Sequence, residues 1–599
     1  MPTLKRGNQP SIRFKKTSIT IFGFLRNPNV LLGVLLSISI ITSRTLAQDA
    51  PIYSQKDIFH PVIAQNGMVA SQESYATKAG LEVLQEGGNA IDAAVTIGFT
   101  LAVTLPEAGN IGGGGFMLVH LAQENQTIAL DYREKAPKAA TRNMFLNEAG
   151  EVDSEKSQNS YLAVGVPGTV AGLTMALEKY GTISLERALQ PAIELAENGM
   201  QVSEFLHNSL VAVKDSMQVS PASMEIFYKP GVIPYEVGEI ILQKDLARSL
   251  RQLTQDGAKA FYQGAIADAI VADMAANGGL ITKEDLADYK PVIREPIRGT
   301  YRGYEIYSMP PPSSGGVHLI QMLNILEGFP IGELGHNTAE TIHIMAETMK
   351  LAYADRSKYL GDPDFVDVPV AGLTSKLYAN QLRRQINREQ ATPSQKIAPG
   401  NPNVFTESNN TTHYSVMDKE GNLVANTYTL NFSYGSKLTV PGTGILLNNE
   451  MDDFSAKPGV PNAFGLIGGE FNAVEPEKRM LSSMTPTIVL KQGNPFLVTG
   501  SPGGSRIITA VLQLILNVID HNMNIAEATN AVRVHHQWLP DELMIEQSLN
   551  GDTTRLLKEK GHQITVVDAM GSTQSILFVD NTLQGASDPR RLGALTLGY

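Results

Sequence analysis

The chain of 599 residues contains no cysteine, one tryptophan and only 18% charged residues. The absence of cysteine excludes a disulfide framework, thiolate metal sites, iron–sulfur clusters and a cysteine nucleophile, so any chemistry must use oxygen and nitrogen groups. Hydrophobic residues amount to 43%, which is ordinary for a folded protein and argues against extensive disorder. The length exceeds that of one simple core and indicates either several structural units or one large layered domain.

Acidic residues are missing from the first 47 positions, which carry seven Lys and Arg. An apolar run at 30–41 follows, and Thr45-Leu46-Ala47 offers small residues for cleavage before Gln48. The run is about a dozen residues long, shorter than the roughly 18–20 that span a bilayer. We therefore expect 1–47 to be a signal peptide and the mature protein to be exported, periplasmic or secreted, with no membrane segment. The alternative is an uncleaved membrane anchor, because the basic region before the run is long.

The remaining 552 residues carry 41 bases and 60 acids, a balance that argues against nucleic acid as a partner. Local patterns predict a helix from Tyr75 to Glu86, an Asn89 cap on the next helix, and further helices over 169–290 and 337–360. A polar stretch rich in Pro and Asn at 391–410 is a predicted loop. Strands follow it at 411–418, 423–430, 487–490, 496–499 and 576–579, the first two as a hairpin. A helix-rich part thus precedes the loop, and a strand-rich block follows it.

Several familiar catalytic patterns are absent. The four glycines at 112–115 are not followed by Gly-Lys-Ser/Thr, so we interpret them as close backbone packing rather than a phosphate cradle. No G-x-S-x-G nucleophile elbow occurs. Ser313 and Ser314 precede a predicted helix, and we interpret them as cap residues.

Histidine pairs do not form a metal-binding pattern either. His535 and His536 are adjacent on a predicted strand and would point to opposite faces. His343 and Glu347 lie one helical turn apart, but two ligands are too few, and a surface or packing role is expected. We predict neither a metal nor a cofactor.

Thr411 remains as a candidate nucleophile. A hydroxyl needs an adjacent base, and a terminal α-amine, with a pKa of roughly 7.7–8.0, can serve as that base. Cleavage between Asn410 and Thr411 would therefore place nucleophile and base on one residue. On local pattern alone, an ordinary strand start after a loop is the favoured interpretation of Thr411, because threonine favours strands.

Longer strings accompany Thr411-Thr412-His413-Tyr414-Ser415. They are Asp131-Tyr132-Arg133-Glu134, Leu447-Asn448-Asn449-Glu450-Met451-Asp452-Asp453-Phe454-Ser455, Leu481-Ser482-Ser483-Met484-Thr485-Pro486, Thr499-Gly500-Ser501-Pro502-Gly503-Gly504-Ser505 and Gly585-Ala586-Ser587-Asp588-Pro589-Arg590. Together they resemble, in this order, the motifs of the gamma-glutamyltranspeptidases, a family of N-terminal-nucleophile hydrolases. The resemblance extends from about residue 58 to Tyr599.

The resemblance implies an α+β fold, a four-layer αββα sandwich built as one domain. It implies autocatalytic cleavage of an inactive precursor into a large chain, 48–410, and a small chain, 411–599, which stay together as a heterodimer. The implied activity is transfer of a γ-glutamyl group from glutathione and related small molecules to water, amino acids or peptides. No cofactor and no metal are implied.

The resemblance also assigns catalytic roles. Thr411 would attack the γ-glutamyl amide and form a γ-glutamyl ester. Thr429 matches the family threonine that holds the hydroxyl of the nucleophile. Gly503 and Gly504 match the pair whose backbone N–H groups stabilise the oxyanion, a role that suits glycine because the backbone can approach closely.

The remaining matched positions would bind the glutamyl zwitterion. Arg133, with hydroxyl donors from Ser482 and Ser483, would hold the α-carboxylate. The α-ammonium would be held by acceptors at three positions: Asn431, Glu450 and Asp453. Family members carry Glu or Gln at the position of Glu450. Asp452 is expected to hold the fold, because alternate residues of a strand point away from each other.

One position departs from some bacterial members of the family. In the segment resembling the lid loop, Phe464 stands where those members have a tyrosine that hydrogen-bonds the site asparagine. A phenyl ring cannot donate a hydrogen bond to Asn431, so we expect a looser lid and an altered balance of hydrolysis to transfer.

Two competing functions stay open. The first is an acylase of the same superfamily, of the cephalosporin-acylase type, whose glutaryl substrates lack the α-ammonium. The second is an exported binding protein that is not processed and uses the same pocket without turnover.

Overall fold

The computed structural model describes residues 58–401, 412–463 and 465–599. The predicted leader at 1–47, the predicted cut between Asn410 and Thr411, and Phe464 lie outside the described residues. Residues 59–599 form one compact unit, which is the unit described below.

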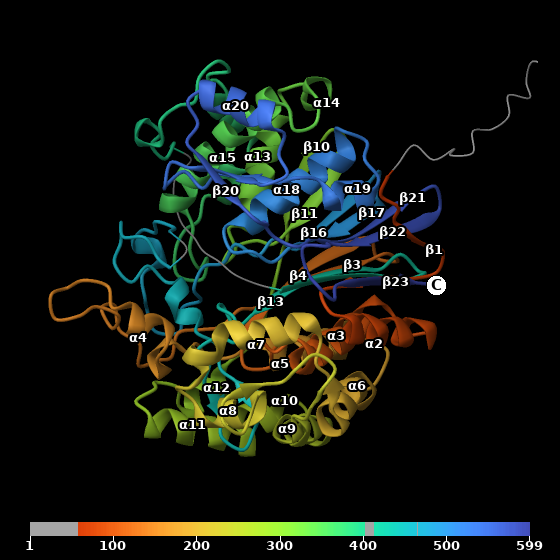
Figure 1. Ribbon diagram of the computed structural model, residues 1–599, viewed down its shortest axis with the longest axis vertical. Coiled ribbons are helices and arrows are strands. Elements are labelled where there is room, and N and C mark those ends of the chain that lie inside the picture. Colours follow the sequence, from red (N-terminus) through yellow and green to blue (C-terminus); the bar gives the residue numbers. More distant parts are fainter. Residues whose placement is uncertain (1–57, 402–411, 464) are drawn as a thin grey trace, which may run out of the picture. The chain divides into compact units, whose positions relative to one another are not determined.

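Two antiparallel seven-stranded sheets lie at the centre of this unit (Figure 1). Sheet I has the order β1 (Val62–Ala64), β22 (Thr582–Ser587), β21 (Gln574–Val579), β17 (Asn494–Thr499), β16 (Thr487–Lys491), β11 (Tyr304–Ser308) and β10 (Ile297–Tyr301). Sheet II has the order β23 (Leu595–Gly598), β2 (Met68–Ser71), β12 (Thr412–Met417), β13 (Leu423–Thr429), β3 (Gly114–Leu121), β4 (Gln126–Tyr132) and β9 (Val292–Arg294).

Helices cover the outer face of each sheet, so that the layers follow the order αββα (Figure 1). The helices on sheet I are α13 (Gly315–Leu326), α15 (Ala339–Tyr359) and α18 (Arg506–Ile519), and those on sheet II are α2 (Ser74–Gln85), α3 (Ala90–Thr104) and α5 (Thr169–Tyr180). Between the sheets, Phe116 and Leu118 of sheet II belong to one apolar cluster with Ile488 and Val498 of sheet I. Both faces of β3 are therefore buried, which explains its nearly continuous apolar sequence. The predicted four-layer fold is confirmed.

Several predicted elements are also confirmed. The helix expected at 75–86 is α2, and Asn89 caps α3 in a reciprocal capping box with Asp92. The helix expected at 337–360 is α15, and the hairpin after the loop is β12 and β13. The helices that follow α5 in the region 169–290 are α6 (Leu185–Asn198), α7 (Glu204–Met217), α8 (Pro221–Phe227), α9 (Lys244–Asp256), α10 (Ala258–Tyr262), α11 (Ala265–Ala276) and α12 (Lys283–Asp288).

The expected composition is confirmed, because helices dominate before residue 402 and strands dominate after residue 411, but the two parts are not separate layers. Seven of the fourteen strands in the two sheets precede residue 402, and α18, α19 (Ile525–Asn530) and α20 (Gly551–Glu559) follow it. β12, for example, pairs with β2 from the first part and with β13 from the second. Local patterns reveal single elements but not the long-range pairing that mixes them, so each sheet is built from both sides of the predicted cut.

The four glycines at 112–115 pack against backbone, as predicted. A Cβ atom on Gly112 would lie 2.1 Å from the carbonyl oxygen of Leu446, and one on Gly113 would lie 2.0 Å from that of Thr429. A Cβ on Gly114 would lie 2.6 Å from a carboxylate oxygen of Glu134. These contacts leave no room for a side chain at the start of β3. Among the described residues, no helix is both long and apolar enough to cross a membrane.

Candidate active site

Thr411 and Phe464 lie outside the described residues, but the surroundings of Thr429 are described. Thr412 on β12 pairs with Tyr428 on β13, and Thr429 is the last residue of β13. Its side chain is buried, and its hydroxyl oxygen accepts a hydrogen bond from the N–H of Asn431 at 2.8 Å. The register of the hairpin thus places Thr412, which follows Thr411 in the sequence, opposite Tyr428, which precedes Thr429.

Gly503 and Gly504 form the turn between β17 and α18. Both have positive φ, 129° and 64°, which favours glycine at these positions. Their carbonyl groups accept hydrogen bonds from the N–H groups of Arg506 and Ile507 in the first turn of α18. None of the hydrogen bonds between described residues uses the N–H of Gly503 or Gly504. The geometry therefore leaves two adjacent backbone donors close to the positive end of a helix dipole.

Arg133 follows β4 and is completely buried. Its Nε donates to the carbonyl oxygen of Met480 at 3.0 Å, and Nη2 donates to that of Leu481 at 3.3 Å. Nη1 is paired with Glu450 and Nη2 with Asp453. The structure thus brings three of the predicted substrate-binding residues into direct contact.

The reason that Glu450 and Asp453 reach the same arginine is local. Glu450–Asp453 is a 3₁₀ turn, η3, in which residues three apart lie on the same side. Asp452 points elsewhere and accepts a hydrogen bond from the hydroxyl of Ser157, at 2.6 Å, on α4 (Ser154–Gln158). Asp452 therefore links two segments of the fold, as we expected. The strand geometry on which we based that expectation is wrong, because a 3₁₀ turn replaces the strand.

Negative charge exceeds positive charge around Arg133. Besides Glu450 and Asp453, Glu134 lies 3.7 Å from Nη1 of Arg133 and is completely buried. Burial raises the pKa of Glu134 to about 7, although the charge of Arg133 opposes the rise. Burial likewise raises the pKa of Glu450 well above its usual value, with Arg133 again opposing and the charges of Glu134 and Asp453 adding to the rise. The cluster of Arg133, Glu134, Glu450 and Asp453, called the Arg133 cluster below, therefore binds protons near neutral pH.

The other predicted substrate-binding residues lie beside the Arg133 cluster. Asn431 has φ 78° and donates from Nδ2 to the carbonyl oxygen of Asn449, the residue before Glu450, at 3.0 Å. Ser482 and Ser483 are buried and follow Leu481, whose carbonyl oxygen contacts Arg133. Each predicted substrate-binding residue thus belongs to the Arg133 cluster or is linked to it, Asn431 through Asn449 and the two serines through Leu481.

Sequence reasoning missed two residues here and misread a third. Ser314 precedes α13, but its hydroxyl does not cap the helix and donates instead to the carbonyl oxygen of Ser482 at 2.9 Å. Ser313 does accept from the N–H of Gly315, at 3.1 Å, and donates to the carbonyl oxygen of Met484. Arg356, on α15, donates from Nη2 to the hydroxyl of Ser483. Glu134 and Arg356 are the two missed residues, and their approach to the site depends on tertiary packing. The sequence showed only that Glu134 is adjacent to Arg133.

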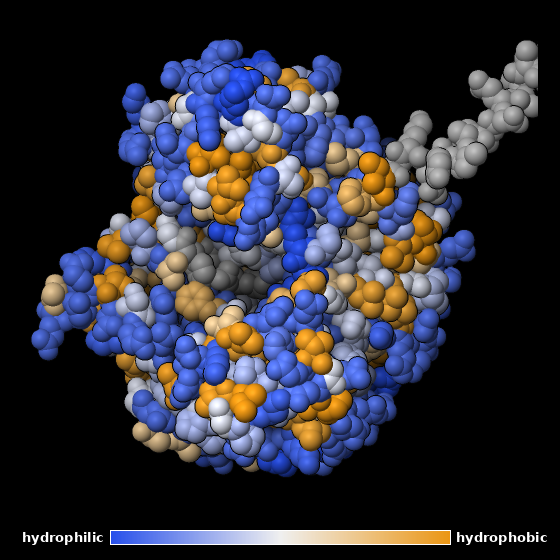
Figure 2. All heavy atoms as spheres, viewed as in Figure 1, coloured by the Kyte–Doolittle hydropathy of each residue, from blue (hydrophilic) through white to orange (hydrophobic). Residues whose placement is uncertain are grey.

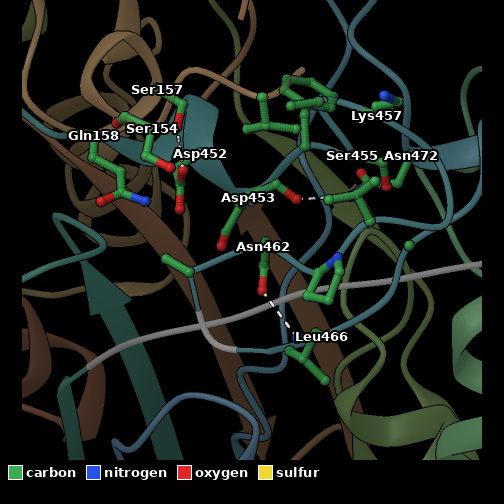
Figure 3. A pocket seen from close by; sticks show the side chains of 17 residues that line it. Ser154, Ser157, Gln158, Asp452, Asp453, Ser455, Lys457, Asn462, Leu466 and Asn472 are labelled. Carbon is green, nitrogen blue, oxygen red and sulfur yellow. Dashed lines mark hydrogen bonds between the residues drawn. The ribbon is translucent and has the colours of Figure 1, made fainter. Parts of the chain in front are cut away.

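A cavity of about 110 Å³ opens next to η3. It is lined by Asp452 and Asp453, by α4, and by residues of the segments 454–463 and 466–468. Ser157 and Asp452 face each other at one side of it (Figure 3). Burial raises the pKa of Asp452 to about 7. One face of the described unit is visibly hollowed (Figure 2).

His343 and Glu347 are buried, so the packing role is confirmed and the surface role is wrong. The structure also brings a third possible ligand, His562, to within 2.7 Å of His343. Protein groups already engage these side chains: the second ring nitrogen of His343 contacts the carbonyl oxygen of Asn387, and Lys350 donates to Glu347 at 2.8 Å. The trio is therefore a satisfied polar network that joins α15 to the turn after α20.

The adjacent His535 and His536 have separate partners, as their predicted orientation requires. His535 Nδ1 contacts the hydroxyl of Thr509 at 2.9 Å, and His536 Nε2 lies 3.3 Å from a carboxylate oxygen of Asp541. Burial lowers the pKa of both imidazoles. The two side chains do not converge on a common point.

Comparison with known sequences identifies the family. The sequence profile of the family described as Gamma-glutamyltranspeptidase matches residues 76–597. The chain belongs to this family. It is 54% identical over 581 residues to the glutathione hydrolase proenzyme of Escherichia coli (strain K12), an alignment that covers 96% of this chain and 99% of that relative.

Solved structures agree with the family assignment. The cephalosporin acylase from Bacillus halodurans is 30% identical with a TM-score of 0.82, and the match covers 92% of this chain and 99% of that one. A chain of the gamma-glutamyltranspeptidase from Helicobacter pylori is 50% identical with a TM-score of 0.55. That match covers 58% of this chain and 97% of the other.

Proposed function

We propose that this protein transfers γ-glutamyl groups from glutathione and other γ-glutamyl compounds to water, or to amino acids and peptides. Membership of the gamma-glutamyltranspeptidase family and the high identity to a glutathione hydrolase proenzyme support this proposal. The observation that carries it is the Arg133 cluster. A buried guanidinium, two carboxylates from one 3₁₀ turn and two serines meet beside Thr429, and together they complement both charges of an α-amino acid.

The proposed recognition is an exchange of ion pairs. Without substrate, the guanidinium of Arg133 is paired with Glu450 and Asp453. When a glutamyl group binds, its α-carboxylate pairs with Arg133 and accepts hydrogen bonds from Ser482 and Ser483. Its α-ammonium pairs with Glu450 and Asp453 and donates to the amide oxygen of Asn431. Charged groups thus exchange partners without any becoming isolated, which avoids the large cost of an unpaired buried charge.

The proposed reaction begins after cleavage between Asn410 and Thr411. The Oγ of Thr411 attacks the γ-carbonyl carbon, and its proton passes to the new α-amine of the same residue. The N–H groups of Gly503 and Gly504 stabilise the oxyanion of the tetrahedral intermediate, and Thr429 orients the attacking hydroxyl. Collapse breaks the amide bond, and the α-amine returns the proton to the leaving nitrogen. Water or an acceptor amine then attacks the γ-glutamyl ester, and Thr411 Oγ leaves with a proton.

The proposed product of cleavage is a heterodimer of a large chain, 48–410, and a small chain, 411–599. Strands from both sides of the cut occur in both sheets, so neither chain retains a complete sheet without the other. The Helicobacter pylori chain, which covers 58% of this one at almost its full length, is consistent with such a division. We further propose that 1–47 is removed on export and that the mature heterodimer, periplasmic or secreted, acts on small molecules and not on nucleic acid.

A second candidate is acylase activity on glutaryl amides, which the similarity to a cephalosporin acylase favours. A glutaryl group has the carboxylate but no ammonium, so it would take Arg133 and leave Glu450 and Asp453 without a cationic partner. The site therefore favours γ-glutamyl over glutaryl substrates. Comparison of kcat/KM for γ-glutamyl and glutaryl p-nitroanilide tests this, and a preference for the glutaryl compound would make the acylase the better description.

The decisive experiment combines a denaturing gel with this assay. Wild type should give two bands and release p-nitroaniline, whereas Thr411→Ala should give one band of nearly full-length mass and no activity. Thr412→Ala is the matched control, because it removes the neighbouring hydroxyl, which donates to the side-chain oxygen of Gln72 at 2.5 Å. We expect Thr412→Ala to be cut and active. A single uncut band for wild type would refute the enzyme and support an unprocessed binding protein.

A further inference from the structure

Arg356 is a buried arginine with no role in the mechanism above. It lies on α15, in the last turn of a helix that is almost entirely buried. Its Nη2 donates to the hydroxyl oxygen of Ser483, and its Nε donates to that of Ser314 at 3.1 Å. One guanidinium edge therefore holds two serine hydroxyls at the end of the site where the α-carboxylate is proposed to bind.

The segment that carries Ser482 and Ser483 is held from a second direction. The N–H and the hydroxyl of Ser314 both donate to the carbonyl oxygen of Ser482, at 2.7 and 2.9 Å, and the N–H of Ser482 donates to the carbonyl oxygen of Pro312 at 2.8 Å. Backbone contacts from 312–314 thus fix the position of the serine pair. Arg356 adds the only charged side-chain contact to the Ser483 hydroxyl among the described residues.

The direction of these hydrogen bonds has a chemical consequence. A guanidinium can only donate, so the Ser483 hydroxyl must accept from Arg356 and its own hydrogen is directed elsewhere. The neighbouring Ser314 hydroxyl, 3.4 Å away, is itself engaged with Arg356 and Ser482. At 3.4 Å the Ser314 oxygen is a long, weak acceptor for the Ser483 hydrogen. A carboxylate is the better acceptor, and the adjacent positive charge makes the Ser483 hydroxyl a stronger donor.

The charge of Arg356 is present at working pH. Burial lowers its pKa to about 9, while Tyr353 and Asp453 oppose the decrease. Its guanidinium also lies 5.5 Å from the ring centroid of Tyr353, one turn earlier on α15. Tyr353 in turn donates its hydroxyl hydrogen to the carbonyl oxygen of Ser505, next to Gly504. One face of α15 thus contacts both the serine pair and the glycine turn.

We propose that Arg356 is a positioning residue for substrate specificity: through Ser483, it directs a hydrogen-bond donor at the α-carboxylate of the γ-glutamyl group. This inference rests on the proposed function and extends it. Lysine cannot replace Arg356, because a single ammonium cannot reach both serine hydroxyls in the plane of a guanidinium.

The test uses pairs of substrates that differ by one group. γ-Glutamyl p-nitroanilide carries the α-carboxylate, and 4-aminobutyryl p-nitroanilide is the same molecule without it. The ratio of their kcat/KM values measures the contribution of the carboxylate in each variant of the processed enzyme. Arg356→Lys should lower this ratio about tenfold, mainly through a higher KM for the γ-glutamyl compound. A purely structural role would lower both rates together and leave the ratio unchanged.

A double-mutant cycle tests the route through Ser483. In the Ser483→Ala background, Arg356→Lys should change the ratio less than twofold, because the group that it positions is gone. Full additivity of the two substitutions would overturn the proposal, as would an unchanged ratio in Arg356→Lys. If Arg356→Lys is not cut into two chains, Ser314→Ala serves instead. It removes the acceptor of Nε and should lower the ratio in the same direction.

The outcome also separates this inference from the proposed function. If wild type turns over both anilides without preferring the γ-glutamyl compound, or turns over neither, the proposed recognition of the α-carboxylate fails and the role of Arg356 fails with it. If wild type prefers the γ-glutamyl compound and Arg356→Lys retains the full preference, only the role of Arg356 fails.

Discussion

Acidification should selectively weaken binding of the α-ammonium. Burial raises the pKa of Glu134 to about 7 and that of Glu450 well above its usual value, so the Arg133 cluster binds protons near neutral pH. A proton bound by the cluster and an ammonium bound beside it both reduce its excess negative charge, and they therefore compete. Because the protonated form of the cluster is populated as pH falls through about 7, affinity for the ammonium should fall on the acidic side of that value.

The expected size follows from the stoichiometry. One competing proton costs about tenfold in affinity per pH unit well below the pKa, and about 16-fold between pH 7 and pH 5.5, because the site is already half protonated at its pKa. The appropriate measure is the ratio of kcat/KM for γ-glutamyl p-nitroanilide to that for glutaryl p-nitroanilide, which lacks the ammonium. Both reactions need the unprotonated amine of Thr411, so its titration cancels in the ratio. A ratio independent of pH between 5.5 and 8 would refute this account.

A variant of the cluster provides the control. The charge of Asp453 contributes to the raised pKa of both Glu134 and Glu450. Asp453→Asn should therefore lower both pKa values and move the inflection of the ratio to lower pH, while the ratio itself falls at every pH because an ammonium partner is lost. An inflection that stays near pH 7 in Asp453→Asn would show that another group is responsible.

Two further predictions concern the glycine turn and the lid. Gly504→Ala should reduce kcat by about 10²–10³ through misplacement of an oxyanion donor. The control is Gly493→Ala, at a turn with a similarly positive φ of 77° and no atom within 4 Å of the added Cβ, and it should leave kcat unchanged. Equal losses of kcat in both variants would point to backbone strain alone. Phe464→Tyr supplies the hydroxyl that some bacterial members of the family have, and it should change the ratio of transfer to hydrolysis. The ratio is measured as γ-glutamyl dipeptide formed against glutamate released. An unchanged ratio would contradict the expected role of residue 464.

The sequence predicted the fold and the members of the Arg133 cluster better than it predicted their contacts. Arg133, Glu450 and Asp453 stand in continuous motif strings, so the resemblance could identify them one by one. That Glu450 and Asp453 both pair with Arg133 depends on the 3₁₀ turn, which a strand-like interpretation of the same string concealed. Local pattern therefore identified the residues, and only the backbone conformation revealed how they meet.

Residues that act from a distance left no local signal. Arg356 lies in an ordinary helical sequence, and its contact with Ser483 joins residues 127 positions apart. His562 likewise reaches His343 across 219 positions, which is why the trio of possible ligands could not be counted from the sequence. Ser314 was placed correctly ahead of a helix, but the carbonyl oxygen of Ser482 competes for its hydroxyl and removes it from the cap.

The ion pairs of Arg133 explain how such a polar cluster can be buried. Four charged side chains, Arg133, Glu134, Glu450 and Asp453, are almost completely excluded from solvent. Isolated charges would be prohibitively costly there, and removal of one partner from a buried pair typically destabilises a protein by about 3–5 kcal/mol. Mutual pairing and the protons retained by Glu134 and Glu450 offset that cost in the precursor. A substrate that brings one positive and one negative group can replace these internal contacts in kind, whereas a ligand with one charge leaves a buried group without a partner. The proposed selectivity for the α-amino acid end would therefore be a consequence of the same charge balance that allows the pocket to fold.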